Sequence, residues 1–208
     1  MHEAPQRGID EVIRQRLRTP LRLLLPAALA WLNGAWHRLK WLLSGRRVRA
    51  GRYFRVYGPL ILSGPGRVEF GDDCLIISNA IKPVVVRTLS ADAVVSLGRH
   101  TGLNGTAINC VRSIRIDDWS NIADAYITDS KAHSLSADRR SKSVEDVEAG
   151  PVHIGRNVWV SVQVVILDGV NIGENSVIGA CSLVREDVPA GVLAAGNPLR
   201  IIRAIDTL

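Results

Sequence analysis

The sequence predicts an all-β solenoid, a parallel β-helix built from six-residue repeats, with an α-helical segment at its N-terminal end. Aliphatic residues return at every sixth position after residue 150, and small or β-branched residues return four positions after each of them. The chain before residue 56 follows a helical period instead. We expect three parts: a helical segment over residues 1–55, the β-helix over 56–190 and an extension over 191–208.

The six-residue period is unbroken over six units. Its aliphatic positions are Ile154, Val160, Ile166, Ile172, Ile178 and Val184. An amphipathic helix would need apolar returns at three and four residues, and a half-buried strand at two. A period of six suits a short strand and a corner, with one aliphatic side chain pointing inward per unit. Three units close one coil, and coils stack roughly 4.8 Å apart through parallel backbone hydrogen bonds.

The same register appears in fragments further upstream, over residues 70–76, 97–103 and 116–122. The segment Ser134–Pro151 is polar and has no period. Segments of this kind run over the surface and often contribute to function, so we expect an excursion loop over residues 134–151.

The N-terminal segment carries most of the positive charge. Residues 1–55 contain twelve Arg or Lys and three Asp or Glu, whereas the rest of the chain contains fourteen and seventeen. This split argues against a nucleic-acid partner, because no basic face extends over the body of the protein. It fits an anionic surface such as a membrane leaflet, and it fits equally well ordinary solvated arginines beside packed helices.

Two amphipathic helices are expected in this segment, joined near Thr19-Pro20. Their apolar positions are Ile9, Val12, Ile13 and Leu17 in the first, and Leu32, Trp36, Leu39 and Leu43 in the second. The first expectation is that they cap the open end of the β-helix, and the second is peripheral contact with the inner membrane. Neither a signal peptide nor a membrane-spanning helix is expected in this segment.

The three cysteines, Cys74, Cys110 and Cys181, are too few and too scattered for a disulfide framework or a zinc site. Free cysteines fit a reducing compartment, so we expect a cytoplasmic protein without a metal site.

The segment HIGRNVWVSVQVVILDGVNIGENSVIGACSLVREDVPAGVLAAGNPLRIIRAI (residues 153–205) resembles hexapeptide-repeat acyltransferases of the galactoside/maltose acetyltransferase type. It is also similar to O-acetyltransferases of bacterial polysaccharide biosynthesis. The resemblance extends over residues 66–205 and leaves the N-terminal segment out. It implies a left-handed coil, a homotrimer, and acetyl-CoA as a co-substrate in the groove between neighbouring subunits. The left hand comes from the resemblance alone, because general crossover rules favour the right hand.

The resemblance places the family's catalytic histidine at His133, within YITDSKAHSL (residues 126–135). Many relatives carry Asp-His-Asp-His at this point, whereas this chain has Asp129-Ser130-Lys131-Ala132-His133 and lacks the first histidine. An imidazole with a pKa near ~6.5 can take the proton of an attacking hydroxyl and return it to the departing thiolate. Asp129 is a candidate carboxylate partner for His133, on the acceptor side of the site. The other histidines are expected to be structural or on the surface: His2, His37, His100 and His153.

Further site residues follow from the resemblance. Asn104 matches an asparagine that contacts the acceptor, although asparagine is also common at a β-helix corner. Relatives bind CoA at the remaining matching positions, which are Trp159, Ser161, Gly179, Ala180, Arg185, Arg200 and Arg203. The last two would face phosphate groups, for which arginine is well suited, and solvated arginines are the alternative.

We therefore expect an acetyl-CoA-dependent O-acetyltransferase that acts on a saccharide, in bacterial surface polysaccharide biosynthesis. An enzymatic alternative on the same fold is a sugar N-acetyltransferase or a transferase of a longer acyl group. An alternative of another class is a non-catalytic β-helix scaffold that binds partner proteins.

Overall fold

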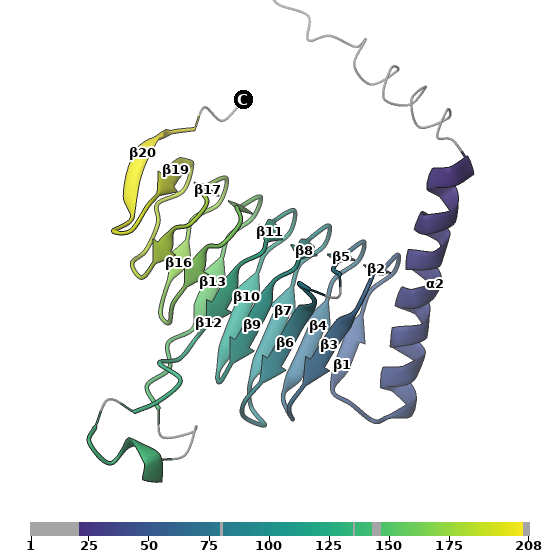
Figure 1. Cartoon of the computed structure of the whole chain (residues 1–208), viewed down its shortest axis with the longest axis horizontal. Coiled ribbons are helices and arrows are strands. Elements are labelled where there is room, and N and C mark those ends of the chain that lie inside the picture. Colours follow the sequence, from purple (N-terminus) through teal and green to yellow (C-terminus); the bar gives the residue numbers. More distant parts are fainter. Residues whose placement is uncertain (1–20, 80, 135, 143–146, 206–208) are drawn as a thin grey trace, which may run out of the picture.

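The computed structural model describes residues 21–79, 81–134, 136–142 and 147–205. It is a stack of short strands with the helix α2 (Leu21–Leu43) across one end and the strands β19 (Val192–Ala195) and β20 (Arg200–Ala204) at the other (Figure 1). A connection projects from the middle of the stack, between two of its coils.

The strands form three sheets, and the strands of each follow one another in space in the order named. Sheet 1 contains β1 (Val48–Ala50), β4 (Arg67–Phe70), β7 (Val94–Leu97), β10 (Ser113–Ile116), β13 (Val152–Ile154) and β16 (Asn171–Ile172). Sheet 2 contains β2 (Arg55–Tyr57), β5 (Leu75–Ile77), β8 (Gly102–Asn104), β11 (Asn121–Ala123), β14 (Trp159–Val160), β17 (Val177–Ile178), β19 and β20. Sheet 3 contains β3 (Leu60–Ser63), β6 (Val84–Thr88), β9 (Ala107–Cys110), β12 (Tyr126–Thr128), β15 (Val165–Ile166) and β18 (Leu183–Val184).

Up to β18, each strand pairs in parallel with the strand three places along the chain. The chain therefore visits sheets 1, 2 and 3 in turn and returns one layer higher, which describes a three-sided coil. We call the three turning regions corner 1–2, corner 2–3 and corner 3–1, after the sheets that they join.

The interior confirms the six-residue period. All six predicted aliphatic positions from Ile154 to Val184 are completely buried, and so is the rest of the central column, including Ile122 and Ile127. The small or β-branched residues four positions after them are buried as well, from Val158 to Val188. One inward side chain per short strand thus fills the core, which makes burial of apolar surface the main stabilising term.

The coil begins earlier than residue 56. Val48–Ala50 is already a strand of sheet 1, and it pairs in parallel with Val68, Glu69 and Phe70 of β4. The predicted boundary is therefore wrong by about eight residues. The error arose because this first strand has no fully buried residue and two arginines directly before it, and so carries little of the apolar period.

The helix α2 caps the coil, which confirms the first expectation for this segment. Its packing face consists of Ala30, Gly34 and Trp41. A Cβ atom on Gly34 would lie 1.9 Å from the backbone oxygen of Phe54, so only glycine allows this close approach. The Trp41 ring lies 5.9 Å from that of Phe54, and together they close the end of the core.

The apolar positions that the sequence marks on this helix do not contact the coil. Leu32, Trp36, Leu39 and Leu43 are all exposed and lie on the side of α2 away from the coil. Periodicity marks the more apolar face, whereas the coil contacts the face that carries Ala30, Gly34 and Trp41. The first expected helix, marked by Ile9 to Leu17, lies outside the described residues.

The expected C-terminal extension continues the architecture at its start. The strand β19 pairs in parallel with β17 and so adds one more layer to sheet 2. The strand β20 then turns back and pairs antiparallel with β19, which ends the parallel stack. Both strands lie within the extension expected over residues 191–208.

Candidate functional site

His133 lies where the chain leaves the coil at corner 3–1, five residues after β12. Its side chain is exposed, and its backbone N–H donates to the carbonyl of Lys131 at 2.7 Å. Ala132, between the two, has a φ of +61°. A hydrogen bond from residue i+2 to residue i across a positive φ is a tight and strained γ-turn. Strain of this kind at a non-glycine residue is common at functional sites.

The base of the excursion is clamped to its returning arm. Ser130 and Ala149 form an isolated antiparallel bridge, and the backbone N–H of Lys131 donates to the carbonyl of Glu148 at 3.2 Å. The ammonium group of Lys131 also pairs with the carboxylate of Glu148. These contacts fix the position from which His133 projects, although it belongs to a loop.

A hollow of about 590 Å³ opens beside His133. The excursion itself supplies its walls, which include Ala132, His133, Ser134, Arg139, Arg140, Lys142 and Val147. Arg139 belongs to a short 3₁₀ turn, η1 (Arg139–Ser141). Three cationic side chains therefore line the same hollow as His133, although Lys142 is paired with Asp138 at 3.5 Å, and they favour a ligand that carries negative charge there.

Asp129 does not orient His133, and that prediction is wrong. Its side chain is completely buried and points away, toward the chain between β9 and β10. Its carboxylate accepts the backbone N–H groups of Val111, Arg112 and Ser113, each at 2.7 Å. A buried carboxylate with three such donors stabilises a turn of the coil, and it does not line the hollow beside His133.

The other predicted site residues, except Arg185, gather on the outer face of sheet 2 and at its corner with sheet 3. Asn104, the last residue of β8, pairs with Ala123 of β11. One layer further on, the backbone N–H of Ser161 donates to the carbonyl of Ile178, and that of Gly179 donates to Ala194. Asn104, Ala123, Ser161, Gly179 and Ala195 thus form a line of mostly small residues, which we call the sheet-2 track.

The track ends at the predicted arginines. Ala195 pairs with Arg200 and Leu193 with Arg203, both across the antiparallel β19–β20 ladder. Neither arginine forms a salt bridge with any of the described residues. From β8 to β20 there are five steps between neighbouring strands, which corresponds to roughly 24 Å at about 4.8 Å per step.

Trp159 lies on the same outer face, next to the track. It is about half exposed and pairs with Asn121 on one side and Val177 on the other. Ala180 is exposed at corner 2–3, directly after Gly179. Arg185 differs from this group, since it follows β18 at the start of corner 3–1, and its guanidinium pairs loosely with Glu186 at 3.7 Å.

The packing of the coil also requires glycine at position 179. A Cβ atom at this position would lie 2.7 Å from the Cβ of Ala195 in the next layer. Close packing of two layers therefore requires a glycine at this point, whether or not a ligand lies against its backbone.

Within one chain, His133 and the sheet-2 track lie on different corners of the coil. His133 extends from corner 3–1, whereas Asn104, Ser161 and Ala180 lie on sheet 2 or at corner 2–3. The predicted base and the predicted donor-binding residues are therefore on different sides of one coil.

Two further histidines have carboxylate partners that sequence reasoning did not find. The Nδ1 atom of His100 lies 2.9 Å from Asp73, and its ring stacks on Trp119 with 3.9 Å between ring centroids. The Nε2 atom of His153 lies 2.8 Å from Asp117. Each pair joins neighbouring layers. An alignment of the repeats in the sequence, corner above corner, would have placed each histidine beside its aspartate.

Both of these histidines are less suited than His133 to act as a base. His153 has both ring nitrogens engaged, because Nδ1 lies 3.0 Å from Asn171. His100 is at corner 1–2, on the surface column that contains the salt bridge of Arg99 and Asp118. The ring of His37 packs against Trp41 in the cap at a tilt of 41°, and burial together with nearby Lys40 lowers its pKa. His2 lies outside the described residues.

The family model described as bacterial transferase hexapeptide (six repeats) matches residues 151–186, the region with the unbroken period. Galactoside O-acetyltransferase of Escherichia coli (strain K12) is 57% identical over 182 residues, and the match covers 77% of this chain and 88% of that protein. The chain belongs to the hexapeptide-repeat acetyltransferase family. The resemblance in residues 153–205 is thereby confirmed.

Other relatives extend the comparison. An acetyltransferase-family protein of Staphylococcus aureus (strain COL) is 49% identical over 74 residues, and the match spans 36% of each of the two chains. The structure of a galactoside acetyltransferase in complex with coenzyme A has a TM-score of 0.52 at 26% identity, covering 81% of this chain and 70% of that one. A hexapeptide-repeat acetyltransferase of Vibrio cholerae has a TM-score of 0.55 at 27% identity, covering 66% and 74%.

Proposed function

We propose that this protein transfers the acetyl group of acetyl-CoA to a hydroxyl group of a saccharide. Membership in the hexapeptide-repeat acetyltransferase family supports the reaction class, and the identity with a galactoside O-acetyltransferase supports a sugar hydroxyl as acceptor. The surrounding pathway that fits this chemistry is the assembly of a bacterial surface polysaccharide from cytoplasmic precursors.

The observation that carries the proposal is the sheet-2 track. It is a line of small residues that runs from Asn104 to the guanidinium groups of Arg200 and Arg203. An elongated donor can lie along it, with its pantetheine arm on Ser161 and Gly179 and its phosphates near the arginines. Asn104, at the other end, is then in place to contact the acceptor.

His133 is the proposed general base. As the acceptor oxygen attacks the thioester carbonyl, the imidazole takes the hydroxyl proton, and a tetrahedral oxyanion forms. When this intermediate collapses, the carbon–sulfur bond breaks and the imidazolium returns the proton to the departing thiolate of CoA. The products are an acetyl ester and free CoA, and His133 is restored to its neutral form.

The active unit we propose is a homotrimer of left-handed coils, as the family resemblance implies. This arrangement supplies what a single chain lacks, because it can bring the excursion of one subunit against sheet 2 of the next. His133 and the sheet-2 track would then face each other across the boundary between subunits.

Thiol release from acetyl-CoA, measured with a panel of saccharides, tests the proposal. We expect release with at least one acceptor, and mass spectrometry should show the addition of one acetyl group, labile to mild base as an oxygen ester is. A base-stable product would instead identify an amine acceptor. No release with any saccharide or amine, together with capture of a partner protein, would favour the scaffold.

Mixed trimers test the position of the site. His133→Ala removes the base, and Ser161→Trp fills the track, so each variant alone should be inactive. When the two variants are mixed in equal amounts and assemble at random, about one subunit boundary in four has an intact His133 on one side and an intact track on the other. The mixture should therefore regain roughly a quarter of wild-type activity. A site within one chain would give no restoration.

A further inference from the structure

The outer face of α2 is strongly apolar and uncovered by any described part of the chain. Nine large side chains of this helix are between 47% and 80% exposed, namely Leu24, Leu25, Leu29, Trp31, Leu32, Trp36, Leu39, Leu42 and Leu43. A contiguous apolar surface of this size on a folded protein marks an interaction site. The helix cannot satisfy it by turning inward, because Gly34 and Trp41 fix its other face against the coil.

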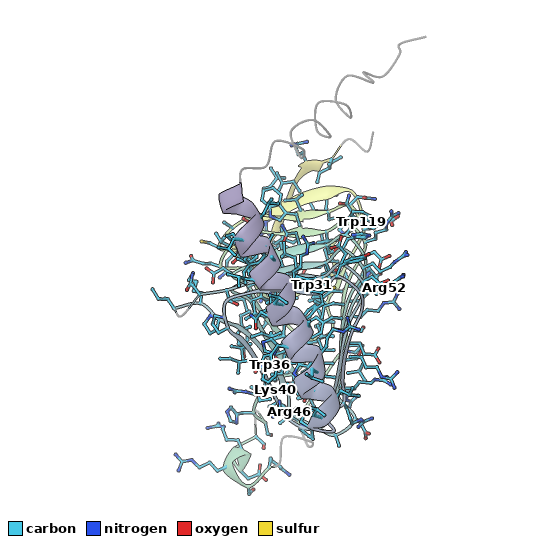
Figure 2. The ribbon with its side chains drawn as sticks, turned by 90° about the vertical axis from the view of Figure 1, so that its right-hand side faces the viewer. Trp31, Trp36, Lys40, Arg46, Arg52 and Trp119 are labelled. Carbon is cyan, nitrogen blue, oxygen red and sulfur yellow. The ribbon has the colours of Figure 1, made fainter. Side chains whose placement is uncertain are left out.

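This apolar face lies at the end of the molecule. The helix crosses the coil at its first layer, so the outward side faces away from all other layers (Figure 1). Figure 2 looks onto the same end, with α2 in front and Trp31, Trp36 and Lys40 along it. A flat surface could therefore meet the whole length of the helix without touching the coil.

Residues 21–58, which form this end of the molecule, carry only basic charges, and two of the arginines, Arg52 and Arg55, are paired with Asp72 and Asp73. From Leu21 to Gly58 the sequence contains no Asp or Glu, and its basic residues are Arg22, Arg38, Lys40, Arg46, Arg47, Arg49, Arg52 and Arg55. Apolar and tryptophan side chains on one side, with Arg and Lys at the edges, are the pattern of a helix that lies in a membrane interface. A second protein copy with the same charge would be repelled.

A hollow of about 880 Å³ opens between the end of α2 and the first strands of sheet 1. Five arginines line it, Arg38, Arg46, Arg47, Arg49 and Arg67, together with Glu69 and the apolar side chains of Leu39 and Leu42. The Glu69 carboxylate is paired with Arg67 at 3.5 Å. Arg46 and Arg47 each donate to a backbone carbonyl, of Leu62 and Ala91, and none of the four remaining arginines has a carboxylate partner among the described residues. This combination suits the phosphate of a lipid headgroup, with its acyl chains on the leucines.

We propose that α2 binds an anionic membrane leaflet with its outer face, while the arginine hollow holds lipid headgroups. The helix lies in the plane of the interface and does not cross it: within the described residues, no helix combines the length and hydropathy needed to span a bilayer. The coil then stands on the membrane with its first layer nearest the lipid. The proposal does not depend on the acetyl transfer proposed above.

Co-sedimentation of the full chain with vesicles tests the proposal. We expect binding to vesicles that contain phosphatidylglycerol, little binding to vesicles of phosphatidylcholine alone, and weaker binding as salt increases. The double variant Trp36→Gln, Leu39→Gln should lower binding at least tenfold, and Arg46→Gln with Arg49→Gln should lower it for anionic vesicles in particular. Trp119→Gln is the matched control, because Trp119 is similarly exposed and lies on a distant corner.

Folding and self-association are checked on the same samples. Each variant should keep the wild-type circular dichroism spectrum. Trp36 and Leu39 are exposed on the outer face of α2, so their substitution should leave the thermal midpoint unchanged. Arg46 donates to the Leu62 carbonyl and Trp119 stacks on His100, so those variants should lower the midpoint only slightly. Equal binding to neutral and anionic vesicles, or binding unchanged by the Trp36 and Leu39 substitutions, would overturn the proposal. So would absence of vesicle binding together with a larger assembly in light scattering that the same substitutions abolish, because the face would then join two copies.

Discussion

The carboxylate of Asp129 accepts the backbone N–H of Val111 at 2.7 Å, across a separation of 18 residues. Two more N–H groups, of Arg112 and Ser113, donate to the same carboxylate, and so does the thiol of Cys110 at 3.4 Å. The excursion that carries His133 therefore starts from a residue that is locked into the preceding layer. The geometry of the proposed base rests on this buried carboxylate even though the two side chains do not meet.

Removal of this carboxylate should destabilise the fold. Asp129→Ala leaves three backbone N–H groups without their acceptor in a buried region, which costs roughly 3 kcal/mol or more of unfolding free energy. Urea denaturation measures the change, and thiol release per folded molecule should fall far less than in His133→Ala. A loss of activity without loss of stability would show that Asp129 acts in the chemistry after all.

The core should respond to cavities as a well-packed interior does. Ile166 is completely buried in the central column, so Ile166→Ala should lower the unfolding free energy by about 2–5 kcal/mol. Ile61 is about half exposed on sheet 3, and Ile61→Ala should change it by less than about 0.5 kcal/mol. Similar effects of the two substitutions would contradict the inward period.

Thiol reactivity should distinguish the three cysteines. Burial raises the pKa of the Cys74 thiol to about 12, and burial with the neighbouring Asp129 carboxylate raises that of Cys110 as well. Cys181 is exposed at corner 2–3, where its Sγ lies 3.4 Å from Gln163. A chromogenic disulfide should therefore modify one thiol per native chain and all three after denaturation.

The same reaction reports on the sheet-2 track. Cys181 follows Gly179 and Ala180, so acetyl-CoA bound along the track should slow the modification of this thiol at least severalfold. The Cys181→Ser variant provides the control, since it should show almost no reaction in the native state. Modification at an unchanged rate under saturating acetyl-CoA would place the donor elsewhere.

Acid should weaken the contact between two layers of sheet 1. Burial tends to raise the pKa of Asp117, but hydrogen bonds from Arg115 and His153 outweigh it and hold the pKa below its usual value of 3.8. A lowered pKa in the folded state stabilises the protein above the unfolded-state pKa, and this contribution disappears as pH falls through the folded value. The destabilisation caused by Asp117→Asn should therefore be present at neutral pH and shrink toward about pH 3. A constant difference across this range would contradict the pairing.

The sequence predicted the coil well because its signal is local and repeated. One inward aliphatic side chain per six residues is visible without knowing which strands pair, and Ile154 to Val184 are buried as expected. The packing face of α2 was missed for a physical reason. Ala30 and Gly34 contribute little hydrophobicity, yet their small size is what permits close approach to Phe54.

The sequence indicated which residues to consider for the site, but only partly where the fold places them. Asp129 is near His133 in sequence, but the coil places it beside residues 111–113 of the layer before. The sheet-2 track also could not be seen in advance, because its layers have unequal lengths: 19 residues separate Asn104 from Ala123, and 16 separate Gly179 from Ala195. Only the pairing of strands shows that these residues form one line.

The turnover of His133→Ala tests the central claim most directly. Thiol release from acetyl-CoA with a saccharide acceptor should fall roughly 10²–10⁴-fold, as expected when a general base is removed. His100→Ala should stay within severalfold of wild type, although His100 has a carboxylate partner. Unchanged turnover of His133→Ala, or an equal loss in His100→Ala, would contradict the assignment of the base.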